Sequence, residues 1–240
     1  MKGNVARGAS YLTRGARMLN HPSLRLFVII PLLVNILIFG SLITWGFSYI
    51  SDAMDSMLSR IPSWLNFIRW ILWPLIVITV SLATGFLFTT IALIIASPFN
   101  ALLAEKAEEL ITGGPVDSLE GFGAAVLAIP KSILRELAKL VYYIPMALFA
   151  VLLSFIPGLG AIAWLILAAW MMSIQFVDYP MDNHQLSFSD VKEAVRRRRL
   201  SSMGFGGLVA LCASIPVINF IVVPAAVVGA TLLWCEELNQ

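Results

Sequence analysis

The stretch LFVIIPLLVNILIFGSLITWGFSYIS, residues 26–51, contains no charged side chain. It is longer than the ~20 apolar residues with which a helix crosses a bilayer. Three further charge-free stretches follow at Trp70–Ala104, Leu140–Val177 and Leu200–Cys235. Hydrophobic residues make up 59% of the 240-residue chain and charged residues only 12%, well below the charged fraction of ordinary soluble domains. The sequence therefore predicts an all-α integral membrane protein.

The last two charge-free stretches are each interrupted near the middle, at Pro157-Gly158 and at Pro216. Proline and glycine break helices, so each half has ~12–18 residues, too few for a full crossing at ~1.5 Å per residue. We therefore expect two hairpins that enter only part of the bilayer (hemi-penetrating hairpins). Two tilted full-length helices in each stretch are the alternative.

The whole chain, residues 1–240, is then expected to form a single membrane domain. Its expected parts, in order, are an amphipathic N-terminal helix (1–22), two transmembrane helices (23–51 and 70–97), cytoplasmic or interfacial helices (98–140), a helical hairpin (141–177), a cytoplasmic turn and helix (178–203), and a second helical hairpin (204–235). The hairpin turns need cover from protein or water, because unpaired backbone groups are not stable against lipid. This requirement predicts a homo-oligomer.

Basic side chains form stripes on the two expected amphipathic segments. Arg7 and Arg14 share one helical face, and Lys131, Arg135 and Lys139 follow one another at four-residue spacing. Interfacial helices commonly turn such stripes toward phosphate headgroups. We expect anionic lipids as partners of both stripes. A basic cluster, Arg196–Arg199, is expected to act as a topology anchor or to concentrate anions near the membrane.

Nothing in the sequence resembles an enzyme site. His21 and His184 are far apart and lack metal-ligand partners at helical spacing. The chain also lacks a glycine-rich phosphate loop, a nucleophile elbow and a paired catalytic carboxylate. We expect no catalytic residue, metal or cofactor, and the net charge of +2 does not indicate a nucleic-acid partner.

The segment His21-Pro22-Ser23-Leu24-Arg25 precedes the first charge-free stretch. Proline favours a helix start, and the first backbone N–H groups of a helix are unpaired and carry partial positive charge. The guanidinium of Arg25 beside such a turn would suit a tetrahedral oxyanion. The alternative is that Arg25 only anchors the helix end on the cytoplasmic side, and its spacing alone favours this anchor.

Four strings in the chain resemble the CysZ family of bacterial sulfate transporters. They are Arg25 followed by FVIIPLLVNI (27–36), ASPFNALLAE (96–105), FIPGLG (155–160) and DYPMDNH (178–184). This resemblance implies uptake of sulfate across the bacterial inner membrane for cysteine synthesis. It also implies a helical oligomer with two full transmembrane helices and hemi-penetrating helix pairs.

The family's sulfate site is a Gly-Leu-Arg-like motif that maps here to Ser23, Leu24 and Arg25. Ser23 stands where the family usually has glycine, so we expect binding to persist with altered geometry. With the resemblance, the oxyanion site becomes the favoured interpretation of Arg25. The alternatives for the chain as a whole are a membrane scaffold that binds anionic lipid and, less favoured, an intramembrane enzyme.

Polar residues beside the apolar stretches suggest a pathway. We expect Asn35, Asn100 and Glu105 to line it, with Glu105, Asp178 or Asp182 carrying a proton if transport is coupled. The chain has no ATP-binding motif. Sulfate, thiosulfate, selenate and molybdate make similar demands on hydrogen-bond donors, and the sequence does not distinguish among them.

Overall fold

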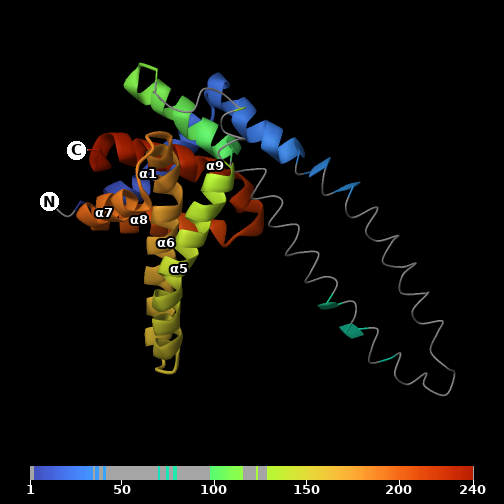
Figure 1. Cartoon of the computed structure of the whole chain (residues 1–240), viewed down its shortest axis with the longest axis vertical. Helices are drawn as coiled ribbons and strands as arrows, with labels where there is room; N and C mark the ends of the chain where they lie inside the picture. The colour runs from blue at the N-terminus through green and yellow to red at the C-terminus, as the bar shows by residue number, and fades with distance from the viewer. Residues whose placement is uncertain are drawn as a thin grey trace. The chain divides into compact units, whose positions relative to one another are not determined.

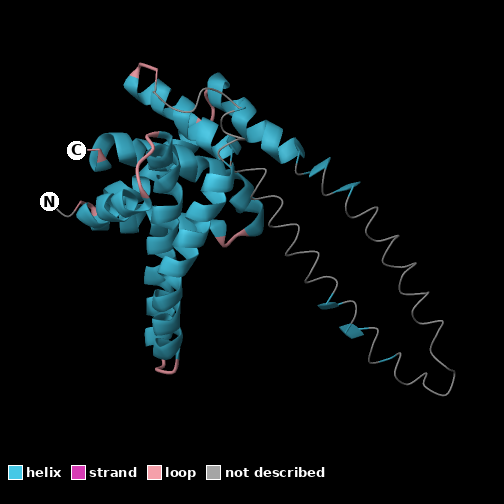
Figure 2. Ribbon diagram, viewed as in Figure 1, coloured by secondary structure: helices cyan, strands magenta, loops and turns pink. Residues whose placement is uncertain are grey.

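The computed structural model describes residues 3–34, 36–37, 40–41, 70, 74–75, 78–79, 98–115, 123 and 129–239. The regular elements within these ranges are helices (Figure 2). Three of them are long and apolar enough to cross a membrane: Pro130–Ser154, Leu159–Asn183 and Ile218–Leu238. The prediction of an all-α membrane protein is confirmed.

The chain divides into two compact units, one formed by Met1–Ile29 with Ser97–Gln240 and the other by Ile30–Ala96. The described part of the second unit is helical. The predicted transmembrane helices at 23–51 and 70–97 lie mostly outside the described residues, although the first begins as an apolar helix over Pro22–Val34. Asn35 also lies outside them.

The first helix, α1 (Val5–Met18), begins at Asn4, whose side chain accepts hydrogen bonds from the backbone of Ala6 and Arg7. It packs against α8 (Arg199–Ala213) and α9 (Pro216–Leu233) (Figure 1). The contact is backbone against backbone. A Cβ on Gly8 would lie 1.9 Å from the Ser201 carbonyl oxygen, and one on Gly15 would lie 2.3 Å from that of Ala225. Small residues permit this close approach, which drives helix association in membranes.

Two long antiparallel helices, α5 (Ile129–Ser154) and α6 (Leu159–Asn183), form the first hairpin (Figure 1). Gly158 adopts a φ of +82° in the turn, a conformation that glycine reaches without strain. The hairpin starts earlier and ends later than the predicted range 141–177. Helix α5 takes in the end of the segment expected to be interfacial, and α6 continues through the expected turn after residue 177.

How far this hairpin can enter the bilayer depends on where its charged side chains lie. The helices are 26 and 25 residues long, not ~12–18, so the predicted length of each half is wrong. Beyond Lys139, however, α5 is uncharged to its end at Ser154, over about 22 Å. That distance is shorter than the ~30 Å hydrocarbon core. Partial penetration is therefore compatible with the longer helices and stays a prediction.

The second hairpin joins α8 to α9 through a short turn before Pro216, which occupies the first turn of α9. This break lies at the predicted proline, and the hairpin begins at Arg199 instead of residue 204. Before it comes α7 (Phe188–Arg197), which starts with a reciprocal capping box between Ser187 and Asp190. After α9 the chain winds into a π-helical turn, η2 (Trp234–Leu238).

The apolar core of the first unit lies where α1, the helix over 98–112, α6, α8 and α9 meet. Its fully buried members come from each of these elements and include Tyr11, Leu103, Ile174, Phe205 and Val227. By contrast, much of the α5–α6 hairpin is exposed and apolar. The core therefore holds these helices together at one end of the α5–α6 hairpin.

Two neighbouring glycines in α8 test the close packing. In Gly206→Ala the new Cβ would lie 1.9 Å from the Ala169 carbonyl oxygen, so we expect a loss of about 1–3 kcal/mol in the free energy of unfolding. In Gly207→Ala the nearest atom would be 3.6 Å away, and we expect stability to be unchanged or slightly raised. Thermal unfolding of the two variants in detergent measures the difference. Equal melting temperatures would contradict the proposed backbone contact.

Candidate functional site

The predicted oxyanion turn connects α1 to the helix over Pro22–Val34. Within this turn the N–H of His21 donates to the Met18 carbonyl at 2.9 Å, and the N–H of Leu24 donates to the His21 carbonyl at 3.0 Å. The N–H of Ser23 lies 3.4 Å from Nδ1 of His21, a long hydrogen bond. The expectation of unpaired N–H groups thus needs correction for Ser23 and Leu24, because His21 supplies acceptors for both.

The three residues of the motif lie in different environments. Leu24 is fully buried and belongs to the core cluster, whereas Ser23 and Arg25 are exposed. Arg25 forms no ion pair with a carboxylate among the residues the structure describes. Leu24 anchors the turn in the core. Its two neighbours in the chain, Ser23 and Arg25, are therefore held in place while their side chains stay exposed.

Arg17 adds a second exposed guanidinium to this region. It lies in the last turn of α1, where the helix dipole favours a cation. The connection from α1 to the next helix therefore carries Arg17, His21 and Arg25, all exposed, and it has no acidic residue between positions 3 and 34. Its electrostatic character suits an anion.

Two of the expected pathway residues, Asn100 and Glu105, lie on the helix over 98–112, close to the end of α6. Nδ2 of Asn100 is 3.3 Å from the Tyr179 hydroxyl. Glu105 is partly buried, and its carboxylate lies 4.0 Å from Nζ of Lys106. Within the described residues, no hydrogen bond or ion pair joins Asn100 or Glu105 to the Ser23–Arg25 turn.

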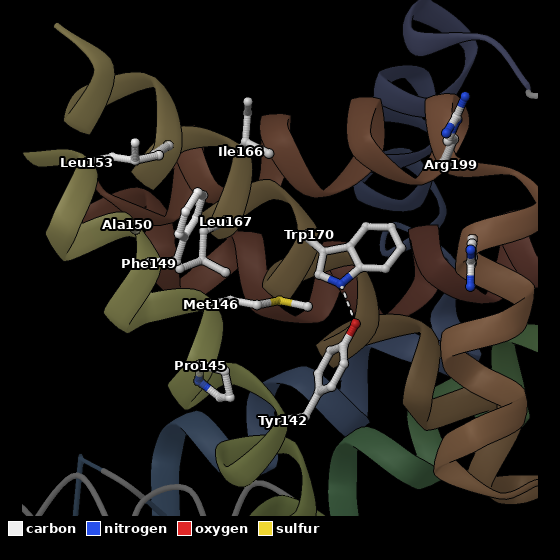
Figure 3. A pocket seen from close by; sticks show the side chains of 12 residues that line it. Tyr142, Pro145, Met146, Phe149, Ala150, Leu153, Ile166, Leu167, Trp170 and Arg199 are labelled. Atoms are coloured by element: carbon white, nitrogen blue, oxygen red, sulfur yellow. Dashed lines mark hydrogen bonds between the residues drawn. The ribbon is translucent and has the colours of Figure 1, made fainter. Parts of the chain in front are cut away.

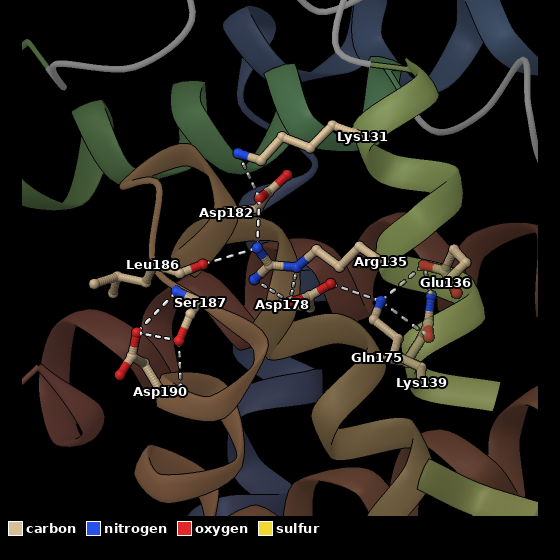
Figure 4. A network of polar contacts seen from close by, with 10 residues as sticks. All are labelled: Lys131, Arg135, Glu136, Lys139, Gln175, Asp178, Asp182, Leu186, Ser187 and Asp190. Carbon is tan, nitrogen blue, oxygen red and sulfur yellow. Dashed lines mark hydrogen bonds and ion pairs between the residues drawn. The ribbon is translucent and has the colours of Figure 1, made fainter. Parts of the chain in front are cut away.

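Asp178 and Asp182 belong to a network of ion pairs between α5 and α6 (Figure 4). The guanidinium of Arg135 contacts Oδ1 of Asp178 at 2.5 Å and Oδ1 of Asp182 at 2.6 Å, and it also donates to the Leu186 carbonyl at 2.8 Å. Nζ of Lys139 lies 2.6 Å from the other oxygen of Asp178. Two cations thus neutralise a carboxylate whose side chain is only 8% exposed.

This network overturns the expected role of the second basic stripe. Arg135 and Lys139 have side chains that are 10% and 3% exposed and point at α6, not toward lipid headgroups. Lys131, the most exposed of the three, lies 3.7 Å from Asp182. Burial of a charge requires a partner, and the DYPMDNH string supplies the two aspartates.

The first basic stripe is also paired inside the protein. Arg14 forms an ion pair with Glu236, and Nε of Arg7 lies 3.0 Å from Glu237. The Tyr11 hydroxyl donates to these same two carboxylates, at 3.1 and 3.0 Å. Burial, together with the negative charge of Glu237, raises the pKa of Tyr11, which therefore remains a donor. Both guanidiniums thus pair with the C-terminal turn η2, yet their side chains stay 57% and 40% exposed, so the expectation that they face phosphate headgroups stays a prediction.

One buried polar pair has no signal in the sequence. His184 Nε2 lies 2.8 Å from Oε1 of Glu108, which is 4% exposed. The second oxygen of Glu108 and the indole nitrogen of Trp234 are buried without a hydrogen-bond partner in the described part of the chain. The residues come from separate segments, so only the fold brings them together.

Together, these features define a polytopic helical membrane protein with a cationic turn at one helix start and buried ion pairs between its helices. The family described as "Sulfate transporter CysZ/Etoposide-induced protein 2.4" matches residues 11–224. The chain belongs to this family. A "Sulfate transporter CysZ" of Pectobacterium atrosepticum is 41% identical over 237 residues, covering 97% of this chain and 86% of the relative.

Two relatives from other bacteria show a similar sequence identity to the chain. The "Sulfate transporter CysZ" of Pseudomonas fluorescens is 42% identical over 240 residues, covering 99% of this chain and 96% of the relative. That of Pseudomonas aeruginosa strain LESB58 is 42% identical over 238 residues, covering 97% and 96%. The resemblance inferred from the four strings is thus confirmed over nearly the whole chain.

The buried ion pairs can be tested with Arg135→Ala. The variant would leave Asp178 facing one cation and Asp182 with only the exposed Lys131. We expect a loss of about 3–5 kcal/mol in the free energy of unfolding, because removing one partner strands a buried charge. Arg197→Ala is the matched control, since Arg197 pairs with Glu193 on the surface, and it should change stability by less than about 1 kcal/mol. Chemical denaturation in detergent compares them, and similar losses would argue against a buried network.

Proposed function

We propose that this chain mediates sulfate uptake across the bacterial inner membrane, as a multi-pass protein that hydrolyses no ATP, and that Ser23, Leu24 and Arg25 form its capture site. The observation that carries the proposal is the near full-length similarity to several proteins named sulfate transporter. Support for the site comes from the exposed guanidinium of Arg25 beside a helix start, which has no ion-pair partner among the described residues. As the resemblance to the family implies, the sulfate taken up would serve cysteine synthesis.

The capture site works through charge and preorganisation. The guanidinium offers a planar fork of donors that matches two oxygens of a tetrahedral anion. The partial positive charge of the helix N-terminus adds to its field. Leu24, locked in the core, reduces the ordering cost when the anion binds. Arg17 extends the positive field toward the approaching anion.

Membrane potential sets an energetic limit on this transport. Moving a dianion into a cell that is negative inside costs ~4.6 kcal/mol per 100 mV, from ~2.3 kcal/mol for each charge. A passive channel therefore accumulates sulfate only when metabolism keeps the internal concentration low, whereas coupling to cations would offset the cost. We favour a channel-like or weakly coupled pathway that stays wet, because sulfate's hydration must be replaced by donors.

Asn35, Asn100 and Glu105 remain our proposed lining of this pathway. Among the proposed proton carriers, Asp178 and Asp182 each form an ion pair with Arg135, at 2.5 and 2.6 Å. Among the described residues, the ion-pair partner of Glu105 is Lys106, at 4.0 Å, so Glu105 is the least engaged of the three carboxylates. We therefore place Glu105 first among the carriers if transport is coupled to protons.

The partners follow from the exposed surface. Several large apolar side chains on α5 and α6, including Phe149 and Ile166, are more than half exposed within one chain. Such a surface must meet lipid or protein. We propose that the chain forms a homo-oligomer and contacts anionic lipids. A lipid-binding scaffold without transport is the alternative, and sulfate flux from the purified protein alone separates the two.

Arg25→Ala should weaken sulfate binding by about 10- to 100-fold and slow radiolabelled sulfate flux into proteoliposomes. The estimate reflects the loss of about 1.5–3 kcal/mol for a hydrogen bond to a charged group. Arg25→Lys should fall between wild type and Arg25→Ala, because it keeps the charge and loses the planar fork. Arg197→Ala controls for the loss of one exposed arginine elsewhere. Wild-type affinity and flux in Arg25→Ala would remove the capture role.

Ser23→Gly restores the residue usual in the family. We expect its sulfate affinity to stay within a few-fold of wild type, since the backbone N–H and Arg25 are retained. Titration calorimetry with sulfate measures it. A loss as large as that of Arg25→Ala would show that the serine hydroxyl is required here.

Proton coupling can be tested at Glu105. If transport is coupled, an imposed inward proton gradient should speed sulfate uptake by the wild type, and Glu105→Gln should remove this acceleration while leaving uptake without a gradient. Flux measured with and without the gradient distinguishes the two cases. Acceleration that survives in Glu105→Gln would eliminate Glu105 as the carrier.

A further inference from the structure

A groove of about 780 Å³ runs along the α5–α6 hairpin (Figure 3). Most of its wall is apolar, with Met146, Phe149 and Leu153 from α5 and Ile166 from α6. These side chains lie on the part of the hairpin that carries no charge. The groove therefore offers an apolar ligand an extended apolar contact.

The length of the groove matches one leaflet of a bilayer. From Tyr142 to Leu153 the wall of α5 extends over about 16 Å at 1.5 Å per residue. One leaflet contributes about 15 Å, half of the ~30 Å hydrocarbon core. A single acyl chain lying beside α5 would thus be covered along most of its length.

Beyond the apolar wall, basic side chains line the groove. Arg196 and Arg199 line the groove, both are exposed, and neither is ion-paired among the described residues. Lys192 is nearby, with its Nζ 5.1 Å from the centre of the Tyr142 ring. Basic side chains at the edge of an apolar groove complement an anionic group attached to a hydrocarbon chain.

Aromatic polar groups lie between the apolar wall and the arginines. Trp170 donates from Nε1 to the Tyr142 hydroxyl at 3.2 Å, and Figure 3 shows Trp170 between Ile166 and Arg199. The Tyr142 hydroxyl has no acceptor for its own proton in the described part of the chain. Tryptophan and tyrosine favour the membrane–water boundary, where a lipid ester or phosphate oxygen would accept this proton.

We propose that the groove is a binding site for an anionic phospholipid. One acyl chain lies between α5 and α6 against Phe149 and Ile166, and the phosphate lies between Arg196 and Arg199. This assigns to two arginines of the basic cluster a role that is separate from sulfate capture at Arg25. The inference does not depend on the proposed transport function.

The test uses the delipidated full chain in detergent and native mass spectrometry with dioleoyl phosphatidylglycerol as the probe. The wild type should bind it at least tenfold more tightly than dioleoyl phosphatidylcholine, which lacks the net negative charge. The double variant Arg196→Ala/Arg199→Ala should lose that preference. Arg197→Ala, from the same cluster but paired with Glu193 and outside the groove lining, should keep it.

A second variant tests the apolar part of the site. Ala163→Trp places a large side chain in the groove without altering any charge, so it should weaken phosphatidylglycerol binding while the melting temperature shows that the protein is folded. Arg25→Ala should bind the lipid like wild type, which separates this test from that of sulfate capture. If Ala163→Trp does not fold, the two arginine variants decide alone.

Four outcomes would overturn the proposal. Equal affinity for the two lipids, or wild-type binding by the double arginine variant, would remove the anionic site. Displacement of phosphatidylglycerol by equimolar sulfate would mean that the arginines bind a free anion. Dissociation of an oligomer by Ala163→Trp with lipid binding unchanged would mean that a second copy covers the groove.

Discussion

The close contact of α1 with the α8–α9 hairpin is the constraint on which the rest of the first unit depends. Lipid tails are as apolar as leucine, so burial of apolar surface contributes little to helix association in a membrane, and backbone approach through small residues takes its place. Gly8 and Gly15 let α1 touch Ser201 and Ala225 directly. Because α1 is held, the turn that follows it is held as well, and Leu24 anchors that turn in the same core.

Charge pairing is the second organising feature. The carboxylates of η2 hold Arg7 and Arg14, and the aspartates of α6 hold Arg135 and Lys139. A buried charge without a partner would be very costly in an apolar setting. These pairs occupy four of the sixteen lysines and arginines in the chain. Arg17, Arg25, Arg196 and Arg199 stay exposed, and the two proposed ligand sites use the last three of these.

Prediction from the sequence succeeded where the signal is local. Charge-free length indicated a helical membrane protein, and Pro157-Gly158 and Pro216 marked the turns of both hairpins. It failed for two residues of the second basic stripe, because helical spacing shows that Arg135 and Lys139 share a face and does not show which element that face contacts. It also missed Glu108 with His184, which are separated by 76 positions and meet only when the helix over 98–112 packs near the end of α6.

The sequence by itself determined the class of the protein, its family and the position of the candidate turn at Ser23–Arg25, since these depend on composition, string similarity and local helix starts. The tertiary structure decided which cations are available to a ligand. Arg7 and Arg25 look alike in the sequence, yet one is paired with Glu237 and the other is unpaired among the described residues. The physical reason is that pairing depends on distance in space between segments far apart in the chain, and packing alone sets that distance.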